Sequence, residues 1–330
     1  MPTMVRIPLA LLLALPLLAA DPPSAEIANG HIRARLYLPD AANGFYRGTR
    51  FDWSGVIYHL ESAGHTFYAP WFTKLSPNVR DFIYEGDDII AGPCSATAGP
   101  ADEFRPLGYD RAQPGQTFIK IGVGALRKPD TTPYTGYRLY EIADPGKWTV
   151  KRHPSAIEFT HTLNGAYVYR KAISLTKGKA EMVMRHTLKN TSKQSIETTV
   201  YNHNFLVLDG KAPGAGAVIT VPFAIRSSRP PSADLAEISA NRVVYKKTLT
   251  GRDTVFAPIE GFSANPADHE IKIENTALKA GMTLNGDRPL QSINLWSIRS
   301  NISMEPFVAI SVAPGETFTW TTTYRYYALP

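Results

Sequence analysis

Apolar and polar residues alternate with a period of two along most of the chain, from about residue 30 to Tyr327. Such alternation is typical of β-strands, in which successive side chains point to opposite faces. Beyond residue 20, no apolar pattern with the period of a helix persists for more than two turns. The predicted strands lie at 30–38, 52–60, 117–125, 147–152, 156–162, 166–175, 180–189, 195–207, 216–225, 241–249, 254–261, 269–274, 292–298, 303–312 and 317–327.

Turn signals such as Asn43-Gly44, Asn164-Gly165 and Pro314-Gly315 separate these strands. The stretches 90–116 and 226–240 are rich in small residues and proline, and we expect irregular connections there, either binding loops or surface excursions. More than a dozen alternating strands without a blade repeat predict an all-β fold of two large antiparallel sheets packed face to face. The 26 Pro, 24 Gly, 16 Tyr and 14 Phe agree with many short strands joined by turns.

The N-terminal end has the pattern of an export signal. Arg6 precedes an apolar run that ends at Leu18, and small residues follow before Asp21. A membrane anchor is the alternative, but the run is interrupted by Pro16 and is shorter than the roughly 20 residues that a spanning helix needs. We therefore expect a signal peptide at 1–20 and one mature domain at 21–330, with no membrane contact after cleavage.

Cysteine usage and charge narrow the setting. Cys94 is the only cysteine, so no intrachain disulfide forms. Export without disulfides fits a bacterial periplasmic or secreted protein, our expectation here, at least as well as a eukaryotic secretory route. Without Arg6, 34 basic residues of the 35 remain against 29 acidic ones, a net charge of +5. The basic residues are scattered, which argues against nucleic acid as a partner. The excess is compatible with an anionic sugar, or it serves solubility alone.

Several classes of chemistry lack their motifs in this sequence. It has no paired cysteines, no H-E-x-x-H, no P-loop, no dinucleotide-binding glycine signature and no nucleophile elbow. We therefore expect no metal and no cofactor. The remaining candidates for chemistry are histidines, carboxylates and tyrosines.

The most informative segment, 182–210, reads MVMRHTLKNTSKQSIETTVYNHNFLVLDG. It predicts two strands joined by a turn, and on the second strand His203 shares a face with Tyr201 and Phe205, while Asn202 and Asn204 point the other way. Aromatic rings can stack on the C–H face of a sugar, and an imidazole can transfer a proton near neutral pH. The alternative for His203 is a hydrogen-bonded core histidine.

The second informative segment, 302–327, reads ISMEPFVAISVAPGETFTWTTTYRYY. Glu305 interrupts an apolar strand, where a carboxylate is costly unless it is paired, hydrogen-bonded or used in chemistry. It is therefore either a partner in a buried ion pair or a functional group.

These two segments resemble the aldose 1-epimerases, also called galactose mutarotases. The family's Asn-His-x-Tyr-Phe-Asn-Leu-x-Gly motif is similar to the run from Asn202 to Gly210, which follows a turn at 189–192, and Met304-Glu305-Pro306 is similar to the context of the family's C-terminal glutamate. The resemblance implies a β-supersandwich fold, with His203 as the acid that protonates the ring oxygen and Glu305 as the base that takes the proton of the anomeric hydroxyl. No cofactor is implied.

The resemblance also suggests residues that bind the sugar. Lys120 stands where the family has a second histidine, and its charge would suit a carboxylate or sulfate on the substrate. Arg50 is the candidate for the family's sugar-contacting arginine, and His65 is a candidate to replace the missing histidine. Asn202 and Tyr201, beside His203, complete the predicted substrate-binding residues.

Two adjacent acids, Asp102 and Glu103, lie in the predicted loop at 90–116 and are expected at the rim of the pocket or, as is usual for loop carboxylates, in solvent.

The first hypothesis is therefore an enzyme that interconverts the anomers of a small sugar or oligosaccharide, with an anionic sugar left open. The second is a polysaccharide lyase on the same fold, in which Lys120 neutralises a uronate while a histidine or tyrosine abstracts a proton. The third is a noncatalytic carbohydrate-binding protein.

Overall fold

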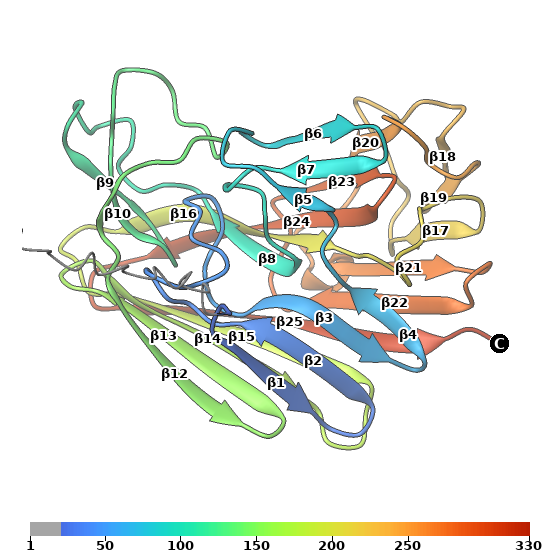
Figure 1. Cartoon of the computed structure of the whole chain (residues 1–330), viewed down its shortest axis with the longest axis horizontal. Coiled ribbons are helices and arrows are strands. Elements are labelled where there is room, and N and C mark those ends of the chain that lie inside the picture. The colour runs from blue at the N-terminus through green and yellow to red at the C-terminus, as the bar shows by residue number, and fades with distance from the viewer. Residues whose placement is uncertain (1–20) are drawn as a thin grey trace, which may run out of the picture.

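Residues 21–330, which the computed structural model describes, form β-strands joined by turns and loops (Figure 1). The helical structure in this part of the chain is a single 3-10 turn, Pro266–Asp268. The prediction of an all-β chain is confirmed. The predicted signal peptide, residues 1–20, lies outside the described residues. Between residues 21 and 330, no helix has the length and apolarity needed to cross a bilayer.

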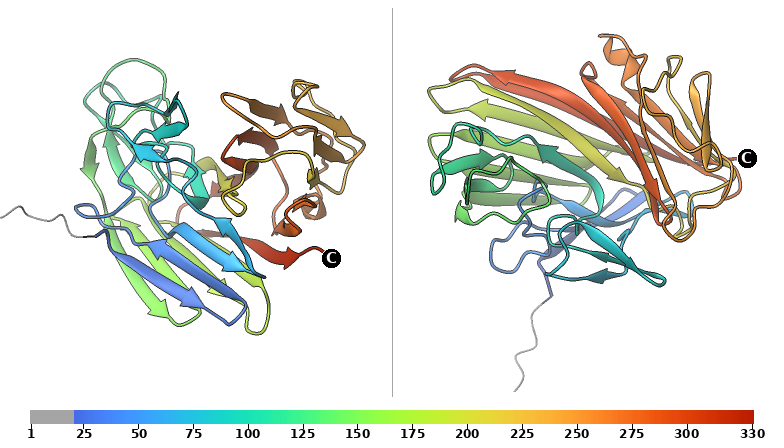
Figure 2. Two further views of the ribbon diagram at one scale, coloured as in Figure 1. Left: turned by 45° about the vertical axis from the view of Figure 1, so that its right-hand side comes forward. Right: turned by 90° about the horizontal axis from the view of Figure 1, so that it is seen from above.

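The largest sheet has ten strands, all paired antiparallel. In spatial order they are β12 (Lys147–His153), β13 (Ala156–Leu163), β14 (Tyr167–Leu175), β15 (Glu181–Asn190), β25 (Thr317–Ala328), β22 (Ala280–Gly286), β21 (Glu270–Asn275), β17 (Ala217–Thr220), β19 (Arg242–Tyr245) and β18 (Ala236–Ser239). Figure 2 shows the long strands of this sheet crossing the molecule. The sheet forms one continuous layer.

Four smaller sheets complete the fold. The five-stranded sheet runs β20 (Thr254–Pro258), β23 (Ser292–Ile298), β24 (Asn301–Val312), β16 (Ile196–Phe205) and β8 (Gly99–Phe104). The four-stranded sheet runs β1 (Ser24–Ala28), β2 (Ile32–Tyr37), β3 (Val56–Ser62) and β4 (His65–Tyr68). The two three-stranded sheets are β11 (Ile142–Asp144), β10 (Gly124–Arg127) and β9 (Thr117–Lys120), and β5 (Lys74–Leu75), β7 (Asp88–Ala91) and β6 (Phe82–Glu85).

The four-stranded and five-stranded sheets both cover the same face of the ten-stranded sheet. Strand β14 shows this, because its alternate residues point to that face. Ile173 joins the core with Leu36 and Ile57 of the four-stranded sheet, whereas Tyr169 meets the ring of Phe104 of the five-stranded sheet at 5.4 Å. The predicted face-to-face packing of two large antiparallel sheets is confirmed, with the smaller sheets added to it.

Between these two contacts, a buried network of charged groups joins the layers. The ammonium group of Lys171 on β14 lies 2.7 Å from a carboxylate oxygen of Asp102 on β8, and Nε2 of His186 lies 3.1 Å from the same oxygen. Burial alone would raise the pKa of Asp102, but Lys171 and His186 hold that pKa below its ordinary value. Asp102, together with Asp52, which lies 3.5 Å from the same ammonium group, is therefore a structural partner that connects the two layers.

Several sequence-based assignments were wrong. Strand β22 was not predicted, and the stretch 226–240, expected to be an irregular connection, contains strand β18. The stretch 90–116 contains strand β8. It was predicted to be a loop because Gly99 and Pro100, which are uncommon in strands, begin it. The predicted strand 117–125 is a hairpin of β9 and β10, because Gly122 turns the chain with φ of +78°, and a Cβ there would lie 2.5 Å from the Asp52 side chain.

Candidate functional site

A cavity of about 300 Å³ lies on the outer face of the five-stranded sheet, away from the ten-stranded sheet. Strands β16, β24 and β23 supply its floor, and the loops and strands of residues 71–95 with the loop around Tyr137 supply its walls. Its lining consists of Arg50, Trp71, Asp81, Phe82, Ser95, Tyr137, Tyr201, His203, Phe205, Phe256, Asn294, Trp296, Glu305 and Phe307. A concave site of mostly aromatic residues with a few convergent polar groups is typical of small-molecule binding.

His203 and Glu305 meet in this cavity. Their strands β16 and β24 are neighbours, with Tyr201 opposite Phe307, and the same antiparallel register brings His203 opposite Glu305. Nε2 of His203 lies 3.2 Å from Oε1 of Glu305. Both side chains are largely buried, at 6% and 12% exposed. The two candidates for acid and base, which are a hundred residues apart in the chain, therefore share one site.

The imidazole of His203 is fixed from several sides. Its Nδ1 lies 2.7 Å from the hydroxyl oxygen of Ser303, which is fully buried. Its ring stacks on Phe205 with 3.7 Å between the ring centres and meets the edge of Trp296. Ser303 was missed by the sequence analysis, although it stands two residues before Glu305 on β24 and so shares its face.

Burial shifts the pKa values of His203 and Glu305 in opposite directions. It lowers the pKa of His203 well below its ordinary value, and the nearby Arg50 guanidinium lowers it further. Burial raises the pKa of Glu305 to about 7, where Glu103 adds to the rise while Arg50 and Asn294 oppose it. Near neutral pH the imidazole is thus uncharged, and the carboxyl group is partly protonated. The pair then holds at most one transferable proton, which is counted in addition to the N–H proton that a neutral imidazole always carries.

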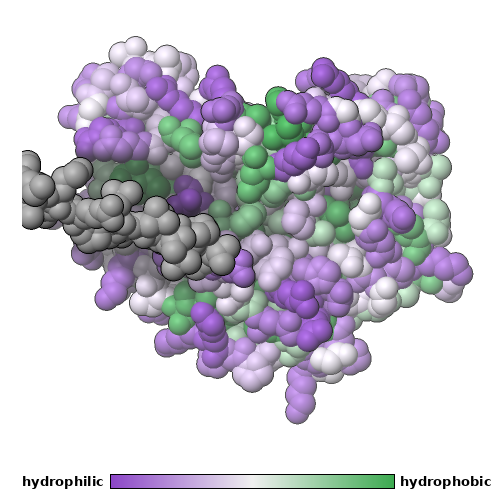
Figure 3. All heavy atoms as spheres, in the orientation of Figure 1, coloured by the Kyte–Doolittle hydropathy of each residue, from purple (hydrophilic) through white to green (hydrophobic). Residues whose placement is uncertain are grey.

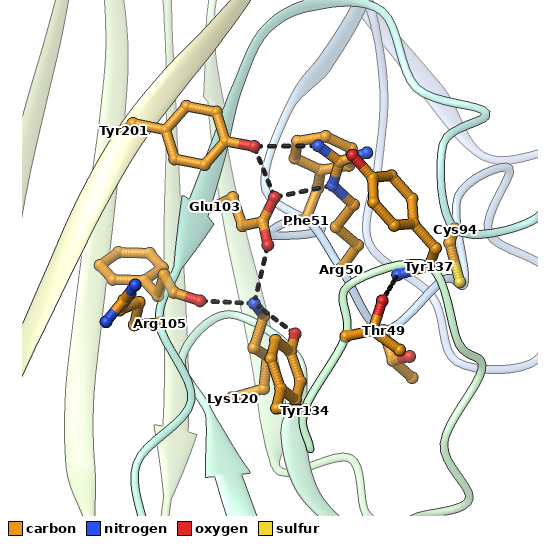
Figure 4. A network of polar contacts seen from close by, with 12 residues as sticks. Thr49, Arg50, Phe51, Cys94, Glu103, Arg105, Lys120, Tyr134, Tyr137 and Tyr201 are labelled. Carbon is orange, nitrogen blue, oxygen red and sulfur yellow. Dashed lines mark hydrogen bonds and ion pairs between the residues drawn. The ribbon is translucent and has the colours of Figure 1, made fainter. Parts of the chain in front are cut away.

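Arg50 and Tyr201 form one wall of the cavity, and Glu103 contacts both of them from behind this wall (Figure 4). Arg50 donates from Nε to Glu103 at 2.7 Å and from Nη2 to the hydroxyl oxygen of Tyr201 at 3.0 Å. The hydroxyl of Tyr201 donates in turn to Glu103 at 2.6 Å. This triangle of contacts holds a guanidinium and a phenol in fixed positions beside His203 and Glu305.

Lys120 lies behind this wall and does not line the cavity. Its side chain is fully buried, with Nζ 3.4 Å from Glu103 and donating to the hydroxyl of Tyr134 at 2.9 Å and to the carbonyl of Phe104. Burial lowers the pKa of Lys120 to about 8, against the opposing effect of Glu103. The expected positive charge in the pocket is therefore directed at Glu103 and not into the cavity.

The comparisons with known proteins can be set beside this geometry. No family profile matches the sequence, and no curated protein matches it either. The solved structure of the Slr1438 protein from Synechocystis superposes with a TM-score of 0.55 at 11% identity, over 98% of this chain and 100% of its own. A galactose mutarotase related enzyme from Lactobacillus acidophilus gives a TM-score of 0.51 at 13% identity, over 92% of this chain and 97% of its own. An aldose epimerase homologue from C. elegans gives a TM-score of 0.51 at 12% identity, over 93% of this chain and 99% of its own.

The fold is galactose mutarotase-like. At 11–13% identity the likeness concerns the fold alone, and it extends over nearly the whole of each chain. The roles of individual residues must therefore be argued from this protein's own site.

In this galactose mutarotase-like fold, two further predicted sugar-binding residues, besides Lys120, lie away from the cavity. The side chain of Asn202 points to the face of the five-stranded sheet opposite the cavity. There its amide nitrogen donates to Asp102 of β8, and its amide oxygen accepts from the Thr322 hydroxyl at 3.4 Å. His65 on β4 lies 2.8 Å from Asp209 and borders a different surface hollow. Asn202 is turned inward by the alternation of its strand, and His65 belongs to a sheet that does not border the cavity.

The structure also adds residues that the sequence analysis missed. Asn294 and Trp296 come from β23, where Asn294 pairs with Glu305 across the sheet. Glu103 was expected at the rim or in solvent, but its side chain is only 13% exposed because β8 adds to the edge of the five-stranded sheet. Within residues 21–330, no three His, Cys, Asp or Glu side chains gather as a candidate metal site.

Proposed function

We propose that the protein is an aldose 1-epimerase-like isomerase that interconverts the anomers of a sugar by acid and base catalysis. The observation that carries the proposal is the contact between His203 and Glu305, 3.2 Å apart in a buried cavity walled by aromatic rings. The galactose mutarotase-like fold supports it. The pattern of residues 1–20 leads us to propose further that the enzyme works in the bacterial periplasm or outside the cell.

The pair supplies what the reaction requires. Glu305 takes the proton of the C1 hydroxyl while His203 gives a proton to the ring oxygen, so the C1–O5 bond breaks and an open-chain aldehyde forms. The aldehyde rotates about its C1–C2 bond, and the same two transfers in reverse close the ring as the other anomer. Protons are neither gained nor lost. In the reacting form the transferable proton of the pair has moved from Glu305 to His203 across the short contact between them, and ring closure restores that form.

The other groups of the cavity suit a sugar. The aromatic rings of Trp71, Trp296 and Phe307 offer apolar faces to C–H groups, while Arg50 and Asn294 offer donors to hydroxyl groups. Arg50 is the one Lys or Arg side chain that lines this cavity in the described chain. A neutral aldose or a uronic acid would both meet it, so the test includes both.

The test follows the anomers of freshly dissolved single-anomer aldoses, neutral and uronic, by proton NMR or polarimetry. Wild-type protein should accelerate their interconversion, and His203→Ala and Glu305→Gln should each reduce the acceleration by about 100-fold or more, the usual contribution of general acid and base catalysis. His65→Ala removes a histidine outside the cavity and should keep the rate. Absence of acceleration for every sugar in the panel would overturn the proposal.

A polysaccharide lyase is the second candidate, because Arg50, Tyr201 and His203 lie together and could neutralise a uronate and abstract its proton. Such an enzyme would produce an unsaturated uronate, which absorbs ultraviolet light. Release of this product from a uronate polymer, without acceleration of mutarotation, would favour the lyase.

A further inference from the structure

A second cavity, of about 530 Å³, adjoins the one that holds His203 and Glu305. The two cavities share four lining residues, Arg50, Tyr137, Tyr201 and Phe307. The smaller cavity lies at the lower end of the range for small-molecule sites, roughly 300–1,000 Å³. A ligand that occupied both would extend across the shared wall.

The shared wall presents flat faces. The rings of Tyr201 and Phe307 stack with 4.4 Å between their centres and 21° between their planes. The guanidinium of Arg50 lies over the ring of Tyr137 at 4.7 Å and is bonded to the hydroxyl of Tyr201. The guanidinium also contacts the ring of Phe51 at 4.5 Å, so the flat surface comes from the aromatic rings, on which a pyranose ring can pack beside fixed donors.

The second cavity has the composition of a site for an uncharged polar ligand. Tyr109 and Tyr134 add aromatic surface, and Thr199 adds a hydroxyl. The charge of Glu103 is matched by its contacts with Arg50 and Lys120. At the exposed part of the lining, Arg105 and Asp110 carry opposite charges. No excess of one sign faces the ligand from this lining.

We propose that the second cavity is a subsite for the next residue of a neutral reducing oligosaccharide. The inference rests on the proposed function. Ring opening needs a free anomeric carbon, which an oligosaccharide has only at its reducing end, so that end must lie against His203 and Glu305. The rest of the sugar then leaves through another ring carbon and crosses Tyr201 and Phe307 into the second cavity.

The first test compares glucose with maltose, cellobiose and lactose, which all end in the same reducing glucose. Saturation-transfer NMR shows which rings of a bound sugar touch the protein. For at least one disaccharide, both rings should receive saturation and the affinity should exceed that of glucose by about tenfold, with a matching gain in kcat/KM. Saturation confined to the reducing ring, with affinity equal to that of glucose for all three disaccharides, would overturn the subsite.

Variants of the second cavity locate the effect. Thr199→Trp fills the cavity and should bring the ratio of disaccharide to glucose affinity close to one. Thr149→Trp makes the same change at an exposed position on β12 and should leave that ratio as in the wild type. Arg105→Ala removes an exposed side chain from the lining and should lower the ratio without a bulky insertion. An unchanged ratio in both cavity variants would contradict the proposed location.

The binding readout separates this inference from the proposed function. Two-ring contact without accelerated mutarotation would leave the subsite standing and overturn the epimerase. Accelerated mutarotation with contact to the reducing ring alone would support the epimerase and overturn the subsite. If no sugar of the panel binds, both proposals are wrong.

Discussion

Burial is the largest cause of the shifted pKa values of His203 and Glu305, the two side chains proposed to transfer protons. Removal from water disfavours the charged form of each, which lowers the pKa of the imidazole and raises that of the carboxyl group to about 7. Ser303 bonds to the other ring nitrogen and so holds the imidazole in orientation toward the carboxylate. The proposed mechanism therefore treats the two side chains as one unit that shares a proton.

This arrangement predicts the pH dependence of the proposed epimerase activity. Anomer exchange needs one transferable proton on the pair, and that proton leaves as the pH rises through the pKa of Glu305, about 7. We expect kcat/KM to be high below pH 7 and to fall as the pH increases above it, while the loss at acidic pH lies well below 6.5 because the pKa of His203 is lowered. Initial rates from NMR between pH 5 and 9 measure this profile. A rate that increases through pH 7 would contradict the shared-proton mechanism.

At the scale of the strand, β8 and β16 divide their residues between two tasks. On β8, Asp102 points to the buried network and Glu103 to the cavity wall. On β16, Asn202 pairs with Asp102 and points to the buried network, and Tyr201 pairs with Glu103 and points to the cavity wall. Because side chains alternate, a shift of one residue in this pairing would exchange the two sets. The contacts of Asp102 with Lys171 and His186 therefore help to fix the register on which the cavity depends.

Asp102→Ala tests this role. It leaves Lys171 buried without its closest partner, and we expect a loss of about 3–5 kcal/mol in the free energy of unfolding at neutral pH. The folded-state pKa of Asp102 is lowered, so its stabilisation is present above the ordinary aspartate pKa and is lost as the pH falls into the acid range. Urea unfolding at several pH values measures both effects.

The matched control for Asp102→Ala is Glu197→Ala, which removes an exposed carboxylate from β16 and should change stability by less than about 0.5 kcal/mol. A loss of similar size in both variants would show that the buried network has no special role.

At the scale of the whole molecule, the ten-stranded sheet supports the site from behind. It packs its inner face against the four-stranded and five-stranded sheets, and the outer face of the five-stranded sheet remains available for the cavity. Figure 3 shows apolar residues reaching the surface in places between the polar ones on the face turned to the viewer. A second hydrophobic core, with Phe51, Trp71 and Phe205, packs on the cavity side of the five-stranded sheet and supports the cavity walls.

The proposed export of the chain can be tested directly. When the full-length chain is expressed in a Gram-negative host, we expect a periplasmic protein whose first residue, measured by mass spectrometry, is Asp21 or a close neighbour. A chain without residues 1–20 should remain in the cytoplasm. Full-length protein that stays unprocessed in the cytoplasm would show that the N-terminal pattern is not an export signal.

Much of the fold and part of the site could be predicted from the sequence because the relevant signals are local. Alternation along one strand determines which side chains share a face, so the opposite directions of His203 and Asn202 were predictable. The same signal was hidden at β8 by Gly99 and Pro100, and the role of Glu103 was missed with it. A motif resemblance pointed to Glu305 as the partner of His203, but not to Asn294 or Trp296.

The sequence by itself determined most of the longer strands and the faces of their side chains, since these depend on neighbours one or two residues away, but it did not show β22 or β8. The tertiary structure decided which distant strands lie side by side, and hence that Lys120 is buried behind Glu103, that His65 lies elsewhere, and that His203 touches Glu305. Those outcomes depend on packing between segments far apart in the chain, which no local pattern encodes. Burial, and with it the shifted pKa values of the site, follows only from that packing.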